Sequence, residues 1–257
     1  MSRPHCPKTC PDRLRALREW CAQPLGRQLA EAEQQVLSEV LGDVFGYHLV
    51  VVDPACSLDS LGNSRVQHQV VQSCTSTGMV VTPSLLAGSE AMPWQTDSID
   101  AFVLPHVLEV SADPHQVLRE IDRCLVGEGH LILSGFNPLG LWGLRRLLSG
   151  WRGQIPWSLR FISLPRLKDW LSLLGFDTLQ AFYLFPRPPW YSRTLDRRLG
   201  FMDRLHRPHR PLLAACYLLV ARKRVVTLTP VKPRWRPRRA ILPGVAEPTQ
   251  RGLSPRG

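Results

Sequence analysis

The sequence lacks the apolar segments of a secreted or membrane-spanning chain. Residues 1–20 contain no apolar stretch, so no signal peptide is predicted. The longest apolar run near the end, residues 212–221, is about half of the roughly 20 residues that a membrane helix needs. We therefore expect a soluble, cytoplasmic protein.

A disulfide framework is also missing, because the seven cysteines are odd in number and scattered. We expect reduced thiols. His5, Cys6 and Cys10 could supply half of a metal site, but no second Cys or His pair follows at a suitable spacing. The sequence therefore predicts no metal site and a solvated amino terminus.

A glycine-rich loop is absent where an α/β fold often carries one. The apolar run Leu49–Val52 ends at Asp53, which is typical of a buried strand. In a doubly wound sheet, a ligand lies beyond the carboxyl end of such a strand. The next residues are Pro-Ala-Cys-Ser, so the sequence predicts the strand without the usual loop.

Acidic residues are scarce at the end of the chain. Residues 222–257 hold ten basic residues and one acidic residue, a net charge of +9 out of +11 for the whole chain. We divide the chain into a polar, partly helical extension (1–27), one domain (28–224) and a basic Pro/Arg-rich tail (225–257) that is predicted to be disordered. The tail could contact RNA or an acidic surface, or it could be merely solvated.

The apolar patterns alternate between helices and strands. Asp113 is predicted to cap a helix that begins at Pro114, with Gln116 as its capping-box partner. Strand–helix–strand order with short loops implies parallel strands and right-handed crossovers. Helices are expected at 12–21, 28–41, 114–125 and 165–174, and strands at 48–53, 66–72, within 79–87, and at 101–104, 131–133, 178–184 and 215–221.

Residues 88–138 carry a specific series of short motifs. They include Ala-Met-Pro-Trp (91–94), Asp100, His-Val-Leu-Glu (106–109), Asp113-Pro114 and Ser-Gly-Phe-Asn-Pro (134–138). This series resembles the core of class I S-adenosylmethionine-dependent methyltransferases of the type 11 group, and above all an uncharacterised bacterial branch. The resemblance covers about residues 30–224. It implies a Rossmann-like, doubly wound, seven-stranded, mostly parallel sheet with an antiparallel last strand.

The resemblance also implies a cofactor, S-adenosyl-L-methionine, across the ends of the first, second and fourth strands. Matching the family's first motif to Asp53 puts Ala55, Ser57 and Asp59 at its glycine positions. The second strand ends at Gln72 without the family's ribose-binding acid. Gly88, with Ser89 and Glu90 beside it, is the best match to the family's adenine-binding aspartate. If three altered polar contacts cost about 1 kcal/mol each, cofactor affinity falls by about two orders of magnitude. The implied cofactor-binding residues are Asp53, Ala55, Ser57, Gln72, Gly88, Ser89, Glu90, Met92, Leu104 and His106.

His106 is the titratable residue after the fourth strand. It could act as a base toward a nucleophilic substrate, or it could satisfy a local backbone bond. We favour the second interpretation, because methyl transfer needs mainly in-line positioning. Glu109 is interpreted as a solvated or capping carboxylate.

A basic insertion at about 186–212 would join the last two strands. It could capture an anionic substrate, or form an amphipathic helix with its aromatic residues in the core. Its aromatic residues are Trp190, Tyr191 and Phe201, and its arginines are Arg187, Arg193, Arg197, Arg198, Arg204, Arg207 and Arg210. The chain is thus predicted to be a methyltransferase of unidentified acceptor. The alternative is a methyltransferase-fold binding module with weakened cofactor binding, associated with RNA through its tail.

Overall fold

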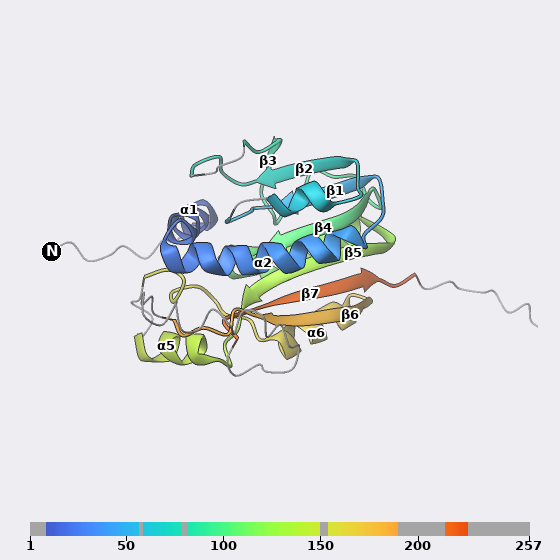
Figure 1. Cartoon of the computed structure of the whole chain (residues 1–257). Coiled ribbons are helices and arrows are strands. Elements are labelled where there is room, and N and C mark those ends of the chain that lie inside the picture. Colours follow the sequence, from blue (N-terminus) through green and yellow to red (C-terminus); the bar gives the residue numbers. More distant parts are fainter. Residues whose placement is uncertain (1–8, 57–58, 79–81, 150–153, 190–213, 226–257) are drawn as a thin grey trace, which may run out of the picture. The chain divides into compact units, whose positions relative to one another are not determined.

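Seven strands form one sheet at the centre of the structure (Figure 1), a computed structural model that describes residues 9–56, 59–78, 82–149, 154–189 and 214–225. The strand order is β3-β2-β1-β4-β5-β7-β6, and β7 alone runs antiparallel to its neighbours β5 and β6. This confirms the expected mostly parallel, Rossmann-like sheet. The strands are β1 (His48–Val52), β2 (His68–Ser73), β3 (Leu85–Leu86), β4 (Ile99–Pro105), β5 (Leu125–Phe136), β6 (Phe176–Leu184) and β7 (Cys216–Lys223).

Helices cover both faces of the sheet. Residues of α1 and α2 pack against one face, and residues of α4 and α6 pack against the other. Leu49 and Val51 point into the first layer and Val50 and Val52 into the second, because successive side chains alternate along a strand. Burial on both faces explains the uninterrupted apolar run of β1. The helices are α1 (Cys10–Cys21), α2 (Pro24–Gly42), α3 (Val107–Val110), α4 (Pro114–Cys124), α5 (Leu141–Ser149) and α6 (Leu164–Leu173).

The start of α4 agrees only in part with its predicted capping. The carboxylate of Asp113 accepts hydrogen bonds from the backbone N–H groups of His115 (3.0 Å) and Gln116 (3.1 Å), as expected for an N-cap. The predicted capping box is wrong, however, since the Gln116 side chain accepts from Arg119. The backbone N–H of Asp113 donates instead to Glu90, at 3.0 Å. A loop distant in sequence therefore supplies the second half of the cap.

The crossover from β1 to β2 contains no α-helix in its described part. Parallel neighbours are usually joined through an α-helix. In the described part of residues 53–67, the crossover contains only the 3-10 helix η1 (Asp59–Asn63). The long helix α2, which precedes β1, packs against η1 on this side of the sheet (Figure 1). Because no α-helix begins in the described part of this crossover, the turn after β1 does not serve as a glycine-rich lead into a helix.

Several predicted features lie outside the described residues. Most of the basic insertion falls in 190–213, the basic tail in 226–257, and Ser57 in a further gap. Within the described ranges, no helix is long and apolar enough to cross a membrane.

Candidate functional site

Two residues with left-handed backbone mark the point where the strand order reverses. Asp53 follows β1 with a φ of 45°, and His106 follows the neighbouring strand β4 with a φ of 58°. Non-glycine residues adopt this conformation uncommonly, and such strain concentrates at functional sites. Both side chains are buried, at 1 % exposure. The carboxyl ends of β1 and β4 are therefore the candidate site, where the switch-point rule expects a ligand.

Asp53 joins the ends of β1 and β2. Its Oδ1 accepts a hydrogen bond from the Ser73 hydroxyl at 3.0 Å and from the Cys74 backbone N–H at 2.7 Å. Burial raises the pKa of Asp53, although both hydrogen bonds and the nearby Arg18 oppose the shift. We call Asp53, Ser73, Cys74, Cys10 and Arg18 the Asp53 cluster.

Arg18 attaches α1 to this cluster. Its guanidinium donates to the carbonyls of Pro54 (3.0 Å), Thr75 (3.0 Å) and Thr77 (2.9 Å) and to the Ser73 hydroxyl (2.9 Å). Burial lowers the pKa of Arg18, and Asp53 opposes this shift. The side chain thus connects the helix to the ends of two strands through four hydrogen bonds.

The end of β4 carries a buried ionic triad that we call the His106 cluster. The Nδ1 of His106 lies 2.8 Å from Glu109 Oε2, and its Nε2 lies 2.9 Å from Glu33 Oε1 on α2. Burial by itself lowers the pKa of His106, but the two carboxylates outweigh it and raise the pKa well above its ordinary value. Burial raises the pKa of Glu109, against the opposing effects of His106 and the Phe136 N–H.

Both ring nitrogens of His106 therefore have carboxylate partners, which corrects the favoured interpretation that the side chain satisfies a local backbone bond. To take a proton from a substrate, the ring would have to give up one of these ion pairs. Glu109, interpreted from the sequence as solvated or capping, is 2 % exposed and also accepts from the Phe136 N–H at 2.6 Å. That interpretation is corrected: the carboxylate is an internal partner of His106.

Gln72 organises the loop that precedes β4. Its Nε2 donates to the Gly88 carbonyl at 3.2 Å, and its Oε1 accepts from the Trp94 indole at 2.6 Å. Glu90 accepts from the Ala112 and Asp113 backbone N–H groups, at 2.9 and 3.0 Å. Residues 88–94 are therefore fixed on one side to β2 and on the other to the start of α4.

Other predicted contacts differ in their surroundings. Ser89 is 2 % exposed, and its hydroxyl has no hydrogen-bond partner among the described residues. Met92 is buried, and its backbone N–H donates to Glu120 at 3.1 Å. Ala55 and Leu104 are packed in the two hydrophobic layers. Ser89 is thus a predicted contact with an unused polar group, as is Asp53 through its Oδ2, whereas Ala55 and Leu104 contribute packing.

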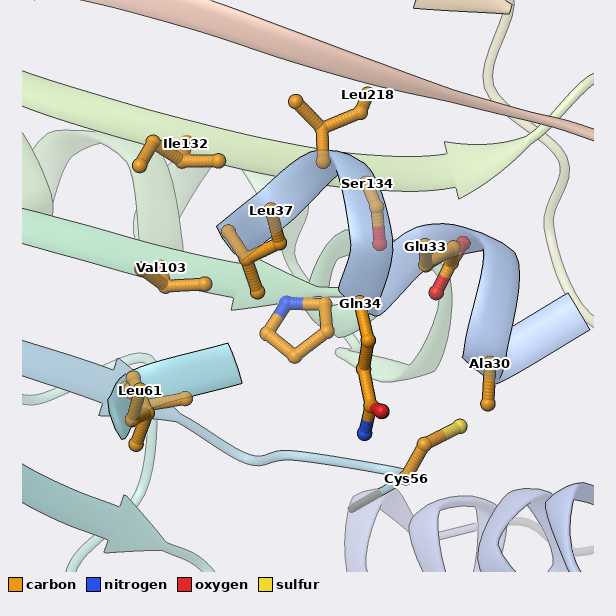
Figure 2. A pocket seen from close by; sticks show the side chains of 12 residues that line it. Ala30, Glu33, Gln34, Leu37, Cys56, Leu61, Val103, Ile132, Ser134 and Leu218 are labelled. Atoms are coloured by element: carbon orange, nitrogen blue, oxygen red, sulfur yellow. The ribbon is translucent and has the colours of Figure 1, made fainter. Parts of the chain in front are cut away.

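A small cavity lies between α2 and the sheet, beside the His106 cluster (Figure 2). Its volume is ≈ 40 Å³, room for a few water molecules and far below the several hundred Å³ of a typical cofactor pocket. Glu33, Gln34 and Ser134 supply its polar side chains, and Leu37, Val103, Ile132 and Leu218 are among its apolar ones. This cavity by itself is too small for a nucleoside cofactor.

Comparison with known proteins identifies the family. Residues 34–133 match the model of a methyltransferase domain. The uncharacterized protein YafS of Escherichia coli (strain K12) is 34 % identical over 212 residues, which are 82 % of this chain and 82 % of that protein. The chain belongs to the class I S-adenosylmethionine-dependent methyltransferase family.

Solved structures of other methyltransferases share the fold. A Thermotoga maritima enzyme, described as a possible histamine N-methyltransferase, superposes with a TM-score of 0.59 at 15 % identity, covering 82 % of this chain and 98 % of its own. An S-adenosylmethionine-dependent methyltransferase from Archaeoglobus fulgidus gives a TM-score of 0.51 at 13 % identity, covering 77 % and 94 %. The class I sheet thus recurs across proteins with few residues in common.

Two buried charged residues of this family member are not predicted by the sequence patterns. Arg18 and Glu33 come from helices that precede the motif-bearing region, and both are buried. A signal was present: Arg18 shares the inner face of α1 with Leu14, Leu17 and Cys21, and Glu33 shares that of α2 with Leu29, Val36 and Leu37. A charge at a core position of an amphipathic helix indicates a buried partner.

Proposed function

We propose that this protein transfers the methyl group of S-adenosylmethionine to an acceptor, with the cofactor held across the carboxyl ends of β1, β2 and β4. Membership of the methyltransferase family supports this function. The site itself contributes one further observation, the orphaned Ser89 hydroxyl. This buried oxygen belongs to the segment that the family resemblance assigns to the adenine side.

The residues present fit the cofactor in a restricted way. Ser89 would bind a polar edge of the adenine, whereas the Gln72 amide, paired with Gly88 and Trp94, would hold residues 88–94 in place. Asp53 would position the strand ends through Ser73 and Cys74 rather than bind the cofactor itself. When bound, the cofactor supplies an electrophilic methyl group on sulfur. The protein would then orient the acceptor in line with that methyl and exclude water.

No dedicated base is assigned in this proposal. His106, the predicted candidate, has both ring nitrogens occupied by carboxylates. Its proposed role is to hold the turn after β4 in its left-handed conformation, through α2 and the Phe136 backbone. An acceptor that binds in a nucleophilic form, such as a thiolate or an uncharged amine that loses its proton to solvent after the transfer, would need no such base.

Arg18 favours a second candidate function, a methyltransferase fold that acts as a binding module without transfer. Its guanidinium contacts Ser73, beside the position where the family carries a ribose-binding acid. A buried cation in that place reverses the local charge. This protein would then retain the sheet and bind a partner through other surfaces.

Isothermal titration of the full chain with S-adenosylmethionine and S-adenosylhomocysteine separates these functions. Transferase function predicts saturable heat and a raised melting temperature. The Ser89→Ala variant should bind about fivefold more weakly, the effect of one lost hydrogen bond. Ser172→Ala removes an exposed hydroxyl on α6 and serves as the matched control. Absence of heat and of any melting shift with both ligands would reject the transferase and favour the binding module.

A further inference from the structure

Two cysteines and an aspartate meet at the edge of the sheet, although they come from three distant segments. Cys10 begins α1, Asp53 follows β1, and Cys74 follows β2. One potential ligand atom from each residue lies within 4.8 Å of the other two. The sulfur atoms of Cys10 and Cys74 are 4.0 Å apart. The fold thus supplies the second cysteine that sequence spacing around Cys10 could not reveal.

We propose that Cys10, Asp53 and Cys74 bind a thiophilic divalent cation, with zinc as the representative ion. Zinc binds thiolates at about 2.3 Å in tetrahedral sites, which places two sulfur ligands about 3.8 Å apart. The observed separation of 4.0 Å is close to this value. It is far longer than the roughly 2.05 Å of a disulfide bond.

Asp53 has one carboxylate oxygen available for a cation. Its Oδ1 accepts from Ser73 and Cys74, whereas its Oδ2 is buried and has no hydrogen-bond partner among the described residues. A buried carboxylate oxygen without a partner is costly. A bound cation would supply the missing partner. Thiolate sulfur and carboxylate oxygen are both zinc ligands in proteins.

The charges around the cluster balance with a divalent ion. Two thiolates and one carboxylate carry −3, which Zn²⁺ and the guanidinium of Arg18 together neutralise. Arg18 is connected to Asp53 through the Ser73 hydroxyl, with hydrogen bonds of 2.9 and 3.0 Å. These two hydrogen bonds would orient the Asp53 carboxylate in the way that outer-shell groups orient metal ligands.

The fourth position of a tetrahedral ion would be open. Within the described ranges, no other His, Cys, Asp or Glu joins this group of ligand atoms. Water or a donor atom of a bound molecule would complete the coordination, as in zinc sites that keep an exchangeable position. The ion would also fasten the start of α1 to the ends of β1 and β2.

Metal binding to the reduced full chain tests the proposal. Zinc affinity is measured by competition with a chromophoric chelator, and cobalt(II) is added separately as a spectroscopic probe. One equivalent of cobalt should give a thiolate charge-transfer band and the intense visible bands of tetrahedral coordination. Cys10→Ser and Cys74→Ser should each weaken zinc binding by at least about tenfold to hundredfold, the loss caused by removing even outer-shell partners.

Cys56→Ser is the matched control. Cys56 forms a second thiol pair with Cys21, at 2.7 Å, away from the three proposed ligands. The zinc affinity of the Cys56→Ser variant should equal that of the unchanged protein. Equal affinity in Cys10→Ser and the unchanged protein, or absence of the cobalt charge-transfer band, would overturn the proposal. Melting curves of the three variants exclude loss of folding as the cause.

Asp53→Asn separates the carboxylate from the thiols. It should retain the cobalt–thiolate band but bind zinc more weakly, because a neutral amide is a poorer ligand than a carboxylate. Unchanged affinity would remove Asp53 from the site. These measurements need no S-adenosylmethionine, so zinc binding without cofactor binding would support the metal site and reject the transferase, and the reverse result would do the opposite.

Discussion

The Asp53 cluster and the His106 cluster have the same arrangement but differ in whether all their polar atoms are paired. Each centres on a buried residue with left-handed backbone at the end of a strand, with φ of 45° and 58°. Each includes an oppositely charged side chain from an amino-terminal helix, Arg18 from α1 or Glu33 from α2. The His106 ring uses both of its nitrogens, however, whereas Asp53 leaves Oδ2 without a partner among the described residues.

This difference assigns separate tasks to the two strand ends. A buried charge that is fully paired fixes local geometry, and removing one member is costly. A buried oxygen that lacks a partner marks a place where a ligand can contribute one. We therefore expect the His106 cluster to determine stability and the Asp53 cluster to determine binding.

The largest effect on stability is expected in the His106 cluster, in which both ring nitrogens of His106 are paired. His106→Asn should lower the free energy of unfolding by about 3–5 kcal/mol near pH 8, because Glu33 and Glu109 then face each other without a cation. Asparagine tolerates the left-handed backbone, so the change tests charge rather than strain. Urea unfolding measures the loss. A cost below about 1 kcal/mol would contradict a closed ionic cluster.

The pH dependence sharpens this test. The pKa of folded His106 is raised above its unfolded value. Its stabilising effect is therefore fully present below about pH 6.5 and is lost as the pH rises through the folded pKa. Below about pH 6.5, where the His106 contribution no longer changes, the penalty in His106→Asn should shrink as the pH falls further, because Glu109, whose pKa is already raised by burial, can take up a proton. Adding Glu33→Gln to His106→Asn should recover part of the lost stability at pH 8.

An intermediate effect is expected from Arg18→Gln. This substitution removes the guanidinium from the Pro54, Thr75 and Thr77 carbonyls, and water can reach Thr77 because that residue is exposed. We expect a loss of about 2–3 kcal/mol, measured by urea unfolding. Arg18→Lys should restore little of this stability, since a lysine ammonium cannot reproduce the planar, forked arrangement of N–H donors of the guanidinium.

Arg15→Gln is the control on the same helix. Arg15 is exposed and pairs only weakly with Glu19, at 3.5 Å. Its unfolding midpoint should match that of the unchanged protein. If Arg18→Gln also matched it, the connection between α1 and the ends of β1 and β2 would contribute nothing to the free energy of unfolding.

Much of the fold was predictable because periodicity and motifs act locally. The run Leu49–Val52 is apolar throughout because both of its faces are covered, and Asp113-Pro114 starts α4 through its own side chain and ring. The mostly parallel, seven-stranded sheet and its antiparallel last strand followed from the family resemblance. The hydrogen bond from the Asp113 N–H to Glu90, in place of the expected one to Gln116, was not predictable, since residues 90 and 113 meet only after folding.

The candidate site was predicted less completely for a related reason. Asp53, Gln72 and His106 were found because they lie at strand ends, and strand ends are visible in a sequence. Their partners were not found. Cys10 and Cys74 are 64 residues apart, and His106 and Glu33 are 73 apart. Such pairs depend on how α1 and α2 dock, which local patterns do not determine.

Asp53→Asn in metal-free protein should have the smallest effect on the free energy of unfolding. It is also the substitution that tests the comparison of the two clusters most directly. Asparagine Oδ1 can still accept from Ser73 and the Cys74 N–H, so the free energy of unfolding near pH 7 should stay within about 1 kcal/mol of the original. Burial raises the pKa of folded Asp53, so its stabilising effect is present below about pH 3.9 and is lost as the pH rises through the folded pKa. The unchanged protein should therefore lose stability relative to Asp53→Asn as the pH rises, which paired urea titrations would detect. If Asp53→Asn instead lowered the free energy of unfolding by several kcal/mol at pH 7, the ionised Asp53 carboxylate would already have all the partners it needs. Asp53 would then be as fully paired as His106.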